Sequence, residues 1–244
     1  MSSAKTEKTD KTARTETEAP SFLKELYRGR FDETLVFPYP EIPEDTKELV
    51  TAFADAYRDF DAAHIDSEKS DADHFFPRDV VKGLGDLGAM GMTIPEEFGG
   101  SGFSATAYCK MVEVIGPLDA SAAIVIGAHQ SIGIKPLLLF GSDEQKKRWL
   151  PDLANGNRVG AFCLTEPEAG SDVGALVTSA RKNQDGTYSL SGNKIFITAG
   201  EHDLTEDIIH PVLARIEGAP AGPAGIPLFR VPTHRANGYG SLGE

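Results

Sequence analysis

Residues 162–172, FCLTEPEAGSD, mark the point where the sequence pattern changes. A short apolar run ends here at Thr165 and passes directly into a turn that contains proline, glycine, serine and carboxylates. Proline, glycine, serine and aspartate are typical turn residues, so the pattern predicts a strand that ends in a turn. Hydroxyls, backbone amides and carboxylates at the end of a strand can contact a ligand, and we expect them to do so here.

The sequence before this stretch, residues 21–160, has mainly helical periodicity. Apolar residues recur every three or four positions in two segments, one after the prolines of residues 37–43 and one after Pro77. The apolar positions expected to face the core are Leu49, Phe53, Tyr57, Phe60, Val80, Val81, Leu84 and Leu87. Ser142 with Gln145 three positions later predicts a capping box, and the helix that it starts is expected to end before residues 155–156.

The sequence after residue 160 has the shorter period of strands. A turn at 183–186 leads to Tyr188 and Leu190, and Ile195 and Ile197 continue the alternation. A second strand pair is expected from IIHPVLARI at 208–216 and IPLFRVP at 226–232, with Pro211 and Pro227 at a sheet edge, a bulge or a strand end. The predicted fold class is therefore α+β, with a helical domain at 21–160 followed by a β domain at 161–244.

Composition and charge exclude several classes of protein. The net charge of −13 argues against general nucleic-acid binding, which needs a basic face. Cys109 and Cys163 lack companions at metal-ligand spacing, so we expect reduced thiols and no metal site there. Residues 120–141 contain His129, Gln130 and Lys135, and we interpret them as buried helices joined by a turn rather than as a membrane span.

Residues 1–20 are rich in threonine and charge and have Met1 as their only large apolar residue. Such a segment cannot bury enough apolar surface to fold, so a disordered tail is expected. It matches neither a secretory signal nor a mitochondrial presequence, and a cytoplasmic location is therefore the default expectation.

Four segments occur in an order and at a spacing that are specific to one protein family. They are IPEEFGGSG at 94–102, GAHQSIGIKPLLLFGSDEQKKRWLPDLANG at 127–156, AFCLTEPEAGSD at 161–172 and LSGNKIFITAG at 190–200. With these segments the chain resembles the acyl-CoA dehydrogenase family from residue 21 to about residue 200. FPYP at 37–40 and GAHQSIG at 127–133 resemble the very-long-chain branch, whereas residues 200–222 resemble the branch of 3-methylmercaptopropionyl-CoA dehydrogenases.

The resemblance implies a middle domain of β-barrel type, incomplete here, that binds FAD. The residues implied to line FAD are Phe162, Cys163, Leu164, Thr165, Glu166, Pro167, Glu168, Ala169, Gly170, Ser171, Phe196, Ile197 and Thr198. The hydroxyl of Thr165 is expected at the polar edge of the flavin and that of Thr198 near flavin N5, while Ser171 is also expected to contact acyl-CoA. Phe196 stands where many relatives have tryptophan, so an aromatic ring is kept and an indole N–H is lost.

The implied reaction is the α,β-dehydrogenation of an acyl-CoA thioester to trans-2-enoyl-CoA, with an electron-transfer flavoprotein as electron acceptor. In the family a glutamate of a C-terminal helical domain removes the α-proton. That domain is expected to lie outside this chain, so no catalytic residue is assigned here and Glu166, Glu168, Glu201 and Glu244 are not put in its place. The complete protein is expected to be a homo-oligomer.

Other functions are compatible with the same residues. The chain can be a non-catalytic fragment that binds acyl-CoA or a partner, and among enzymes of this fold an acyl-CoA oxidase is the alternative. The segment EHDLTEDIIH at 201–210 offers a different site, because His202, Glu206 and His210 would share one face of a helix and could bind a divalent metal. Ile208, Ile209 and Pro211 fit a strand better than such a helix.

Overall fold

A computed structural model describes residues 21–220 and 222–233, so the tail expected at residues 1–20 lies outside the described residues. The chain divides into two units, Met1–Glu41 and Ile42–Glu244. The first unit contains the short helix α1 (Phe22–Tyr27) and the 3-10 turn η1 (Glu33–Leu35). Ser21 begins α1 because its hydroxyl accepts a hydrogen bond from the Lys24 N–H.

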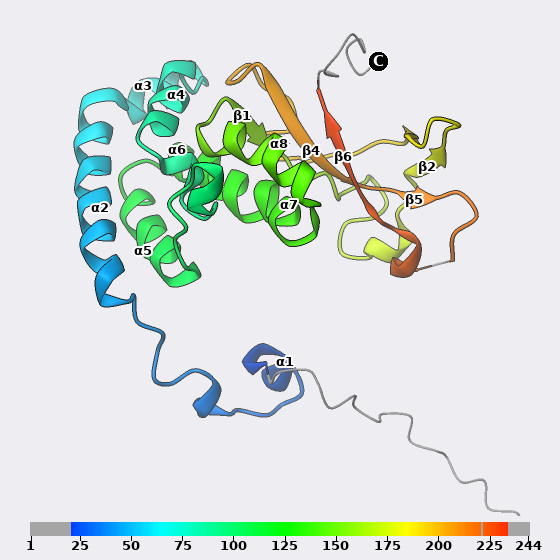
Figure 1. The fold of residues 1–244 in the computed structure, drawn as a ribbon, viewed down its shortest axis with the longest axis horizontal. Helices are drawn as coiled ribbons and strands as arrows, with labels where there is room; N and C mark the ends of the chain where they lie inside the picture. The colour runs from blue at the N-terminus through cyan, green and yellow to red at the C-terminus, as the bar shows by residue number, and fades with distance from the viewer. Residues whose placement is uncertain (1–20, 221, 234–244) are drawn as a thin grey trace, which may run out of the picture. The chain divides into compact units, whose positions relative to one another are not determined.

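The helical part of the second unit precedes its strands, as expected (Figure 1). Its elements are α2 (Glu44–His64), α3 (Ser67–Asp73), α4 (Arg78–Asp86), η2 (Ala89–Gly91), η3 (Glu96–Phe98), α5 (Ala105–Ile115), α6 (Ala120–Ala128), η4 (His129–Ile134), α7 (Lys135–Phe140) and α8 (Asp143–Ala154). The α4 prediction is confirmed, with Val80, Val81 and Leu84 fully buried. In α2, Tyr57 is buried but Leu49 is half exposed, and Val50 takes the place expected for Leu49 in the core.

The capping box of α8 is also confirmed. The Ser142 hydroxyl accepts from the Gln145 N–H, and the Gln145 side-chain oxygen accepts from the Ser142 N–H. These bonds satisfy two donors that the helix itself cannot satisfy. The helix ends at Ala154, before residues 155–156, as the sequence predicts.

The prediction of a turn within residues 120–141 is wrong. Helices α6 and α7 are continuous through η4, which is a π-helix, and its His129 and Gln130 side chains are buried. The ring of His129 lies 2.9 Å from the Leu153 carbonyl through Nε2 and accepts from the Gly160 N–H at 3.0 Å through Nδ1. Gln130 accepts from the Thr93 N–H and donates to the Ala89 carbonyl. These bonds tie the long helix to its neighbours and to the first strand without a turn.

The same stretch, Ala120–Phe140, is the one part of the described residues that is long and apolar enough to cross a membrane by length and composition. A core helix of a soluble protein passes the same test. The criterion therefore gives only weak evidence for a span.

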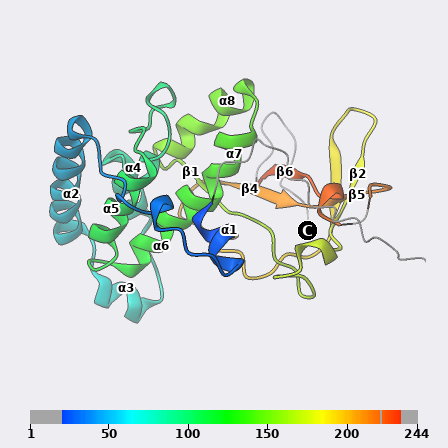
Figure 2. The ribbon, with the colours of Figure 1, turned by 90° about the horizontal axis from the view of Figure 1, so that it is seen from below.

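The strands of the described residues form two three-stranded sheets. One has the order β1-β4-β6, from Arg158–Gly160, Asp207–Leu213 and Leu228–Pro232, and the other has the order β3-β2-β5, from Tyr188–Ser191, Ser179–Lys182 and Arg215–Ile216. In each sheet the central strand has one parallel and one antiparallel neighbour. Figures 1 and 2 show the first sheet next to α7 and α8, with β2 and β5 farther from the helices. The 3-10 turns η5 (Val173–Ala175) and η6 (Pro223–Gly225) lie in the connections.

Pro211 does not lie at an edge, a bulge or a strand end, contrary to expectation. It is in the middle of β4, the central strand of its sheet, opposite Arg230 of β6. Its carbonyl accepts a hydrogen bond from the Cys163 N–H. A residue other than proline at this position would donate its backbone N–H to the Ala161 carbonyl, and proline has no such N–H. The Cys163 thiol lies 3.5 Å from that carbonyl and donates to it instead. A side chain thus replaces the ladder bond that proline removes.

Ile195 and Ile197 do not continue a strand, so that prediction is also wrong. The hairpin ends at Ser191, and residues 192–200 are irregular, with a turn at 198–199 and positive φ at Phe196 and Ala199. Left-handed backbone at non-glycine residues breaks the alternation of a strand. The segment is therefore an irregular connection between β3 and β4.

Candidate functional site

The strand pairing of residues 158–163 leads the chain to the expected flavin turn. Beyond β1, the Ala161 N–H donates to the Ile209 carbonyl at 2.9 Å, and the Leu213 N–H donates to the Cys163 carbonyl at 3.1 Å. The turn itself is closed by the pair Glu166 and Ala169, whose backbones exchange two hydrogen bonds. The TEPEAGSD segment is therefore a tight turn at the end of an extended strand, as predicted from its residue types.

The second expected flavin segment lies beside this turn, although about thirty residues separate the two in sequence. The Ile195 N–H donates to the Thr165 carbonyl at 2.9 Å, and Lys194 Nζ donates to the Leu164 carbonyl at 3.0 Å. These bonds hold Lys194 and Ile195, the residues directly before 196–198, against the end of the strand at Leu164 and Thr165.

The Glu166 side chain points inward and holds the turn. Its carboxylate accepts from Lys194 Nζ at 2.8 Å, from the Thr178 N–H at 3.0 Å and from the Val177 N–H at 2.6 Å. Only 1% of the Glu166 side chain and 12% of the Lys194 side chain are exposed. Burial raises the pKa of Glu166, but the hydrogen bonds from Lys194, Thr178 and Val177 outweigh it and hold that pKa at about 2. We call this pair of side chains the Glu166–Lys194 clasp.

Several polar groups of the two segments take no part in the clasp and have no hydrogen-bond partner among the described residues. The N–H and hydroxyl of Thr165 have no hydrogen-bond partner among the described residues, and neither have the hydroxyls of Thr198 and Ser171. Thr198 and Ser171 are exposed, and Thr165 is half-buried. Phe196 is 90% exposed at a φ of 57°, so a large aromatic ring lies in solvent on strained backbone. Open donors next to an exposed ring are what a flat, polar-edged ligand requires.

The remaining expected site residues differ in exposure. Phe162, Leu164 and Ile197 are half-buried, Cys163 and Ala169 are buried, and Pro167, Glu168 and Gly170 are exposed. Burial raises the pKa of the Cys163 thiol to about 11, against a smaller opposing effect of Lys194. That thiol is therefore neutral at physiological pH and not a nucleophile.

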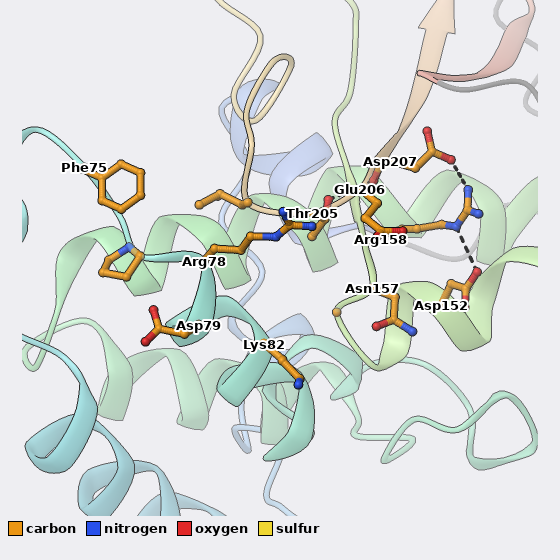
Figure 3. Close-up of a pocket in the computed structure, with 13 residues that line it drawn as sticks. Phe75, Arg78, Asp79, Lys82, Asp152, Asn157, Arg158, Thr205, Glu206 and Asp207 are labelled. Carbon is orange, nitrogen blue, oxygen red and sulfur yellow. Dashed lines mark hydrogen bonds and ion pairs between the residues drawn. The ribbon is translucent and has the colours of Figure 1, made fainter. Parts of the chain in front are cut away.

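A cleft elsewhere in the described residues is lined by none of the expected flavin residues. It has a volume of about 830 Å³ and lies between the N-terminal end of α4, the end of α8 and the segment before β4 (Figure 3). Arg158 binds Asp152 at 2.9 Å and also Asp207, as the dashed lines in Figure 3 mark. Charges of both signs line this cleft and partly neutralise one another, and no motif in the sequence pointed to it.

The alternative of a metal site on a helix is wrong, because residues 207–213 form a strand. The two ring nitrogens of His210 face the carbonyls of Val231 and Gly200, and His202 Nδ1 accepts from the Leu204 N–H. In the described part of the chain no group of three histidine, cysteine or acidic residues could hold a metal ion.

Comparisons with known proteins agree with the geometry. The N-terminal domain of acyl-CoA dehydrogenase matches residues 47–157, and the middle domain of acyl-CoA dehydrogenase matches residues 161–241. The chain is 41% identical to the human mitochondrial very long-chain specific acyl-CoA dehydrogenase over 186 residues, which are 75% of this chain and 28% of that protein. It is 38% identical over 215 residues to the probable acyl-CoA dehydrogenase FadE10 of Mycobacterium tuberculosis, covering 87% of this chain and 32% of the relative.

Solved structures show the same fold. An acyl-CoA dehydrogenase from Bacillus anthracis, complexed with FAD, superimposes with a TM-score of 0.68 at 34% identity, over 80% of this chain and 32% of that chain. Butyryl-CoA dehydrogenase from Megasphaera elsdenii superimposes with a TM-score of 0.66 at 32% identity, over 76% and 48%. The chain spans less than a third of the length of these two curated relatives. Both domain matches, in their order and over most of the sequence, establish that the chain belongs to the acyl-CoA dehydrogenase family.

Proposed function

We propose that this chain provides the FAD-binding and acyl-CoA-binding surface of an acyl-CoA dehydrogenase, which converts an acyl-CoA thioester to trans-2-enoyl-CoA. The observation that carries the proposal is the pairing of residues 164–166 with Lys194 and Ile195, which leaves the N–H and hydroxyl of Thr165 and the hydroxyl of Thr198 without partners in the described residues, near the exposed ring of Phe196. A relative of 34% identity is described as complexed with FAD.

The residues present fit such a cofactor. The N–H and hydroxyl of Thr165 would bind the polar edge of the isoalloxazine ring, Phe196 would cover its apolar surface, and the Thr198 hydroxyl would be a further donor. FAD supplies the acceptor for the hydride that leaves the acyl group. Donors fixed in advance stabilise the charge that develops on the acceptor, and the clasp fixes the Thr165 backbone. Ser171, exposed at the end of the same turn, would contact acyl-CoA.

The same proposal includes an electron-transfer flavoprotein as electron acceptor. The 41% sequence identity to a very long-chain specific acyl-CoA dehydrogenase supports a substrate with a long acyl chain over one with a short acyl chain. A cytoplasmic location and a homo-oligomeric complete protein stay predictions.

The test is a titration of the purified chain with FAD, followed by flavin fluorescence, for the wild type and for Thr165→Val. Valine keeps the shape of threonine and removes one hydrogen-bonding group, so the Kd for FAD should rise about tenfold. The control Thr51→Val removes an exposed hydroxyl from α2 and should leave the Kd unchanged. A wild-type chain that does not bind FAD, or a Thr165→Val variant that binds it as well as the wild type does, would contradict the proposal.

A further inference from the structure

Arg230 of β6 carries buried donors that nothing in the described part of the chain satisfies. Its guanidinium lies 3.9 Å from the ring centroid of Trp149. The Nε and Nη1 atoms are buried without a hydrogen-bond partner, and the side chain has no ion pair among the described residues. An unsatisfied buried donor costs free energy, and more so when the group is charged. A hydrogen-bond acceptor that reaches Arg230 would therefore stabilise the native protein.

The charges around Trp149 do not supply that acceptor. Arg148 and Arg158 also lie at the Trp149 ring, at 4.9 and 5.0 Å. The nearby carboxylate of Asp207 is bound by Arg158, and so is that of Asp152. Burial, followed by repulsion from Arg148 and Arg158, lowers the pKa of Arg230 to about 10, and Asp207 opposes this shift. Arg230 is therefore still charged at physiological pH and is surrounded by an excess of positive charge.

Arg230 forms part of the wall of a small pocket of about 100 Å³ between α7, α8 and the β1-β4-β6 sheet. The apolar side chains that line this pocket are Pro136, Leu137, Phe140, Leu153, Ile209, Pro211, Leu228 and Phe229. The other polar side chain in the wall is Gln145, whose oxygen already accepts from the Ser142 N–H in the capping box. The free side-chain groups of the pocket are thus the Gln145 amide N–H₂ and the guanidinium, which are both donors.

We propose that this pocket binds a small carboxylate with a short apolar body, such as an aliphatic acid of about four carbons. The carboxylate accepts hydrogen bonds from the guanidinium of Arg230, and the hydrocarbon packs against Leu137 and Phe140. A guanidinium is the side chain best suited to a carboxylate, and the apolar walls exclude an ion that is hydrated on all sides. The site uses none of the residues assigned to FAD or to acyl-CoA.

The test is calorimetry and thermal unfolding of the whole chain with sodium butanoate at constant ionic strength. Butanoate should bind saturably and raise Tm, and acetate, which lacks two methylenes, should bind about fifteenfold more weakly because each buried methylene adds about fourfold. Butan-1-ol, which lacks the negative charge, should not raise Tm. If sulfate or phosphate binds in this pocket and butanoate does not, the carboxylate assignment is wrong.

Variants locate the site. Arg230→Leu should abolish the effect of butanoate and, without ligand, should unfold at a higher temperature than the wild type because the uncompensated buried charge is removed. The control Arg181→Gln removes an exposed arginine of β2 and should bind butanoate as the wild type does. In the wild-type chain, the NMR resonance of the Arg230 Nε–H should shift on addition of butanoate, which tests the contact even if Arg230→Leu does not fold. Equal binding by a folded Arg230→Leu variant, or an unshifted Arg230 resonance at saturation, would overturn the proposal.

Discussion

Replacing Glu166 with glutamine should destabilise the chain strongly, because this carboxylate is the acceptor on which the flavin turn depends. Glutamine keeps the size of the side chain but loses its charge, and its amide nitrogen cannot accept from the Val177 N–H. A pKa of about 2 in place of 4.5 corresponds to about 3 kcal/mol of stabilisation of the ionised form. The change also leaves Lys194, which is only 12% exposed, without its counter-ion. We expect the free energy of unfolding to fall by about 3 kcal/mol.

The assay is equilibrium unfolding in urea at pH 7, measured by circular dichroism, for Glu166→Gln, Lys194→Met and the double variant. If the two side chains act as a pair, the double variant should lose about as much as one single variant, and the coupling free energy should be about 2 kcal/mol or more. Glu113→Gln is the matched control, because it breaks an exposed ion pair with Lys110 and should cost less than about 1 kcal/mol. A Glu166→Gln variant within about 0.5 kcal/mol of the wild type, or strictly additive losses, would refute the clasp.

Two further predictions concern the joint between the helices and the first sheet. Gly133→Ala should cost about 1–3 kcal/mol of unfolding free energy, because its Cβ would lie 2.5 Å from the Gly160 carbonyl oxygen, whereas Gly127→Ala in α6 meets no atom closer than 4.0 Å and should be neutral or stabilising; equal stabilities in urea would contradict this reasoning. Burial lowers the pKa of His129 to about 4, so this residue contributes stability that is complete above its unfolded pKa of about 6.5 and is lost as the pH falls towards 4. Between pH 7 and pH 5 the wild type should lose about 2 kcal/mol more than His129→Gln, and parallel pH profiles of the two proteins would show that His129 is not held neutral.

The elements that could be predicted from sequence depend on local interactions. The capping box of Ser142 and Gln145 joins residues three apart, and the buried face of α4 follows from spacing within one helix. The turn at 166–169 was predictable for the same reason, since it is closed by backbone hydrogen bonds between Glu166 and Ala169, three residues apart, and contains Pro167, a typical turn residue.

The features that sequence reasoning missed depend on partners far away in the chain. The turn expected in residues 120–141 is replaced by a π-helix because Gln130 and His129 are bound by Ala89, Thr93, Leu153 and Gly160. Pro211 is tolerated in a central strand because the Cys163 thiol takes over its ladder bond.

The candidate site divides in the same way. Thr165, Ser171, Phe196 and Thr198 were found by their resemblance to a family, and their residue types alone indicated only a turn. The inward role of Glu166 was not predictable, because its partner Lys194 lies 28 residues away and appeared in the sequence as an ordinary charge. The unpaired guanidinium of Arg230 likewise becomes visible only when β6 pairs with β4 beside Trp149.

The central claim, that residues 162–171 and 196–198 form the FAD-binding surface, is tested most directly by amide hydrogen exchange of the chain with and without FAD. The Thr165 N–H has no partner in the described structure and should exchange quickly in the free chain. FAD should slow exchange at residues 164–171 and 196–198, and most strongly at Thr165. Protection confined to the 830 Å³ cleft, at residues 75–82 and 204–207, or no protection at saturating FAD, would contradict it.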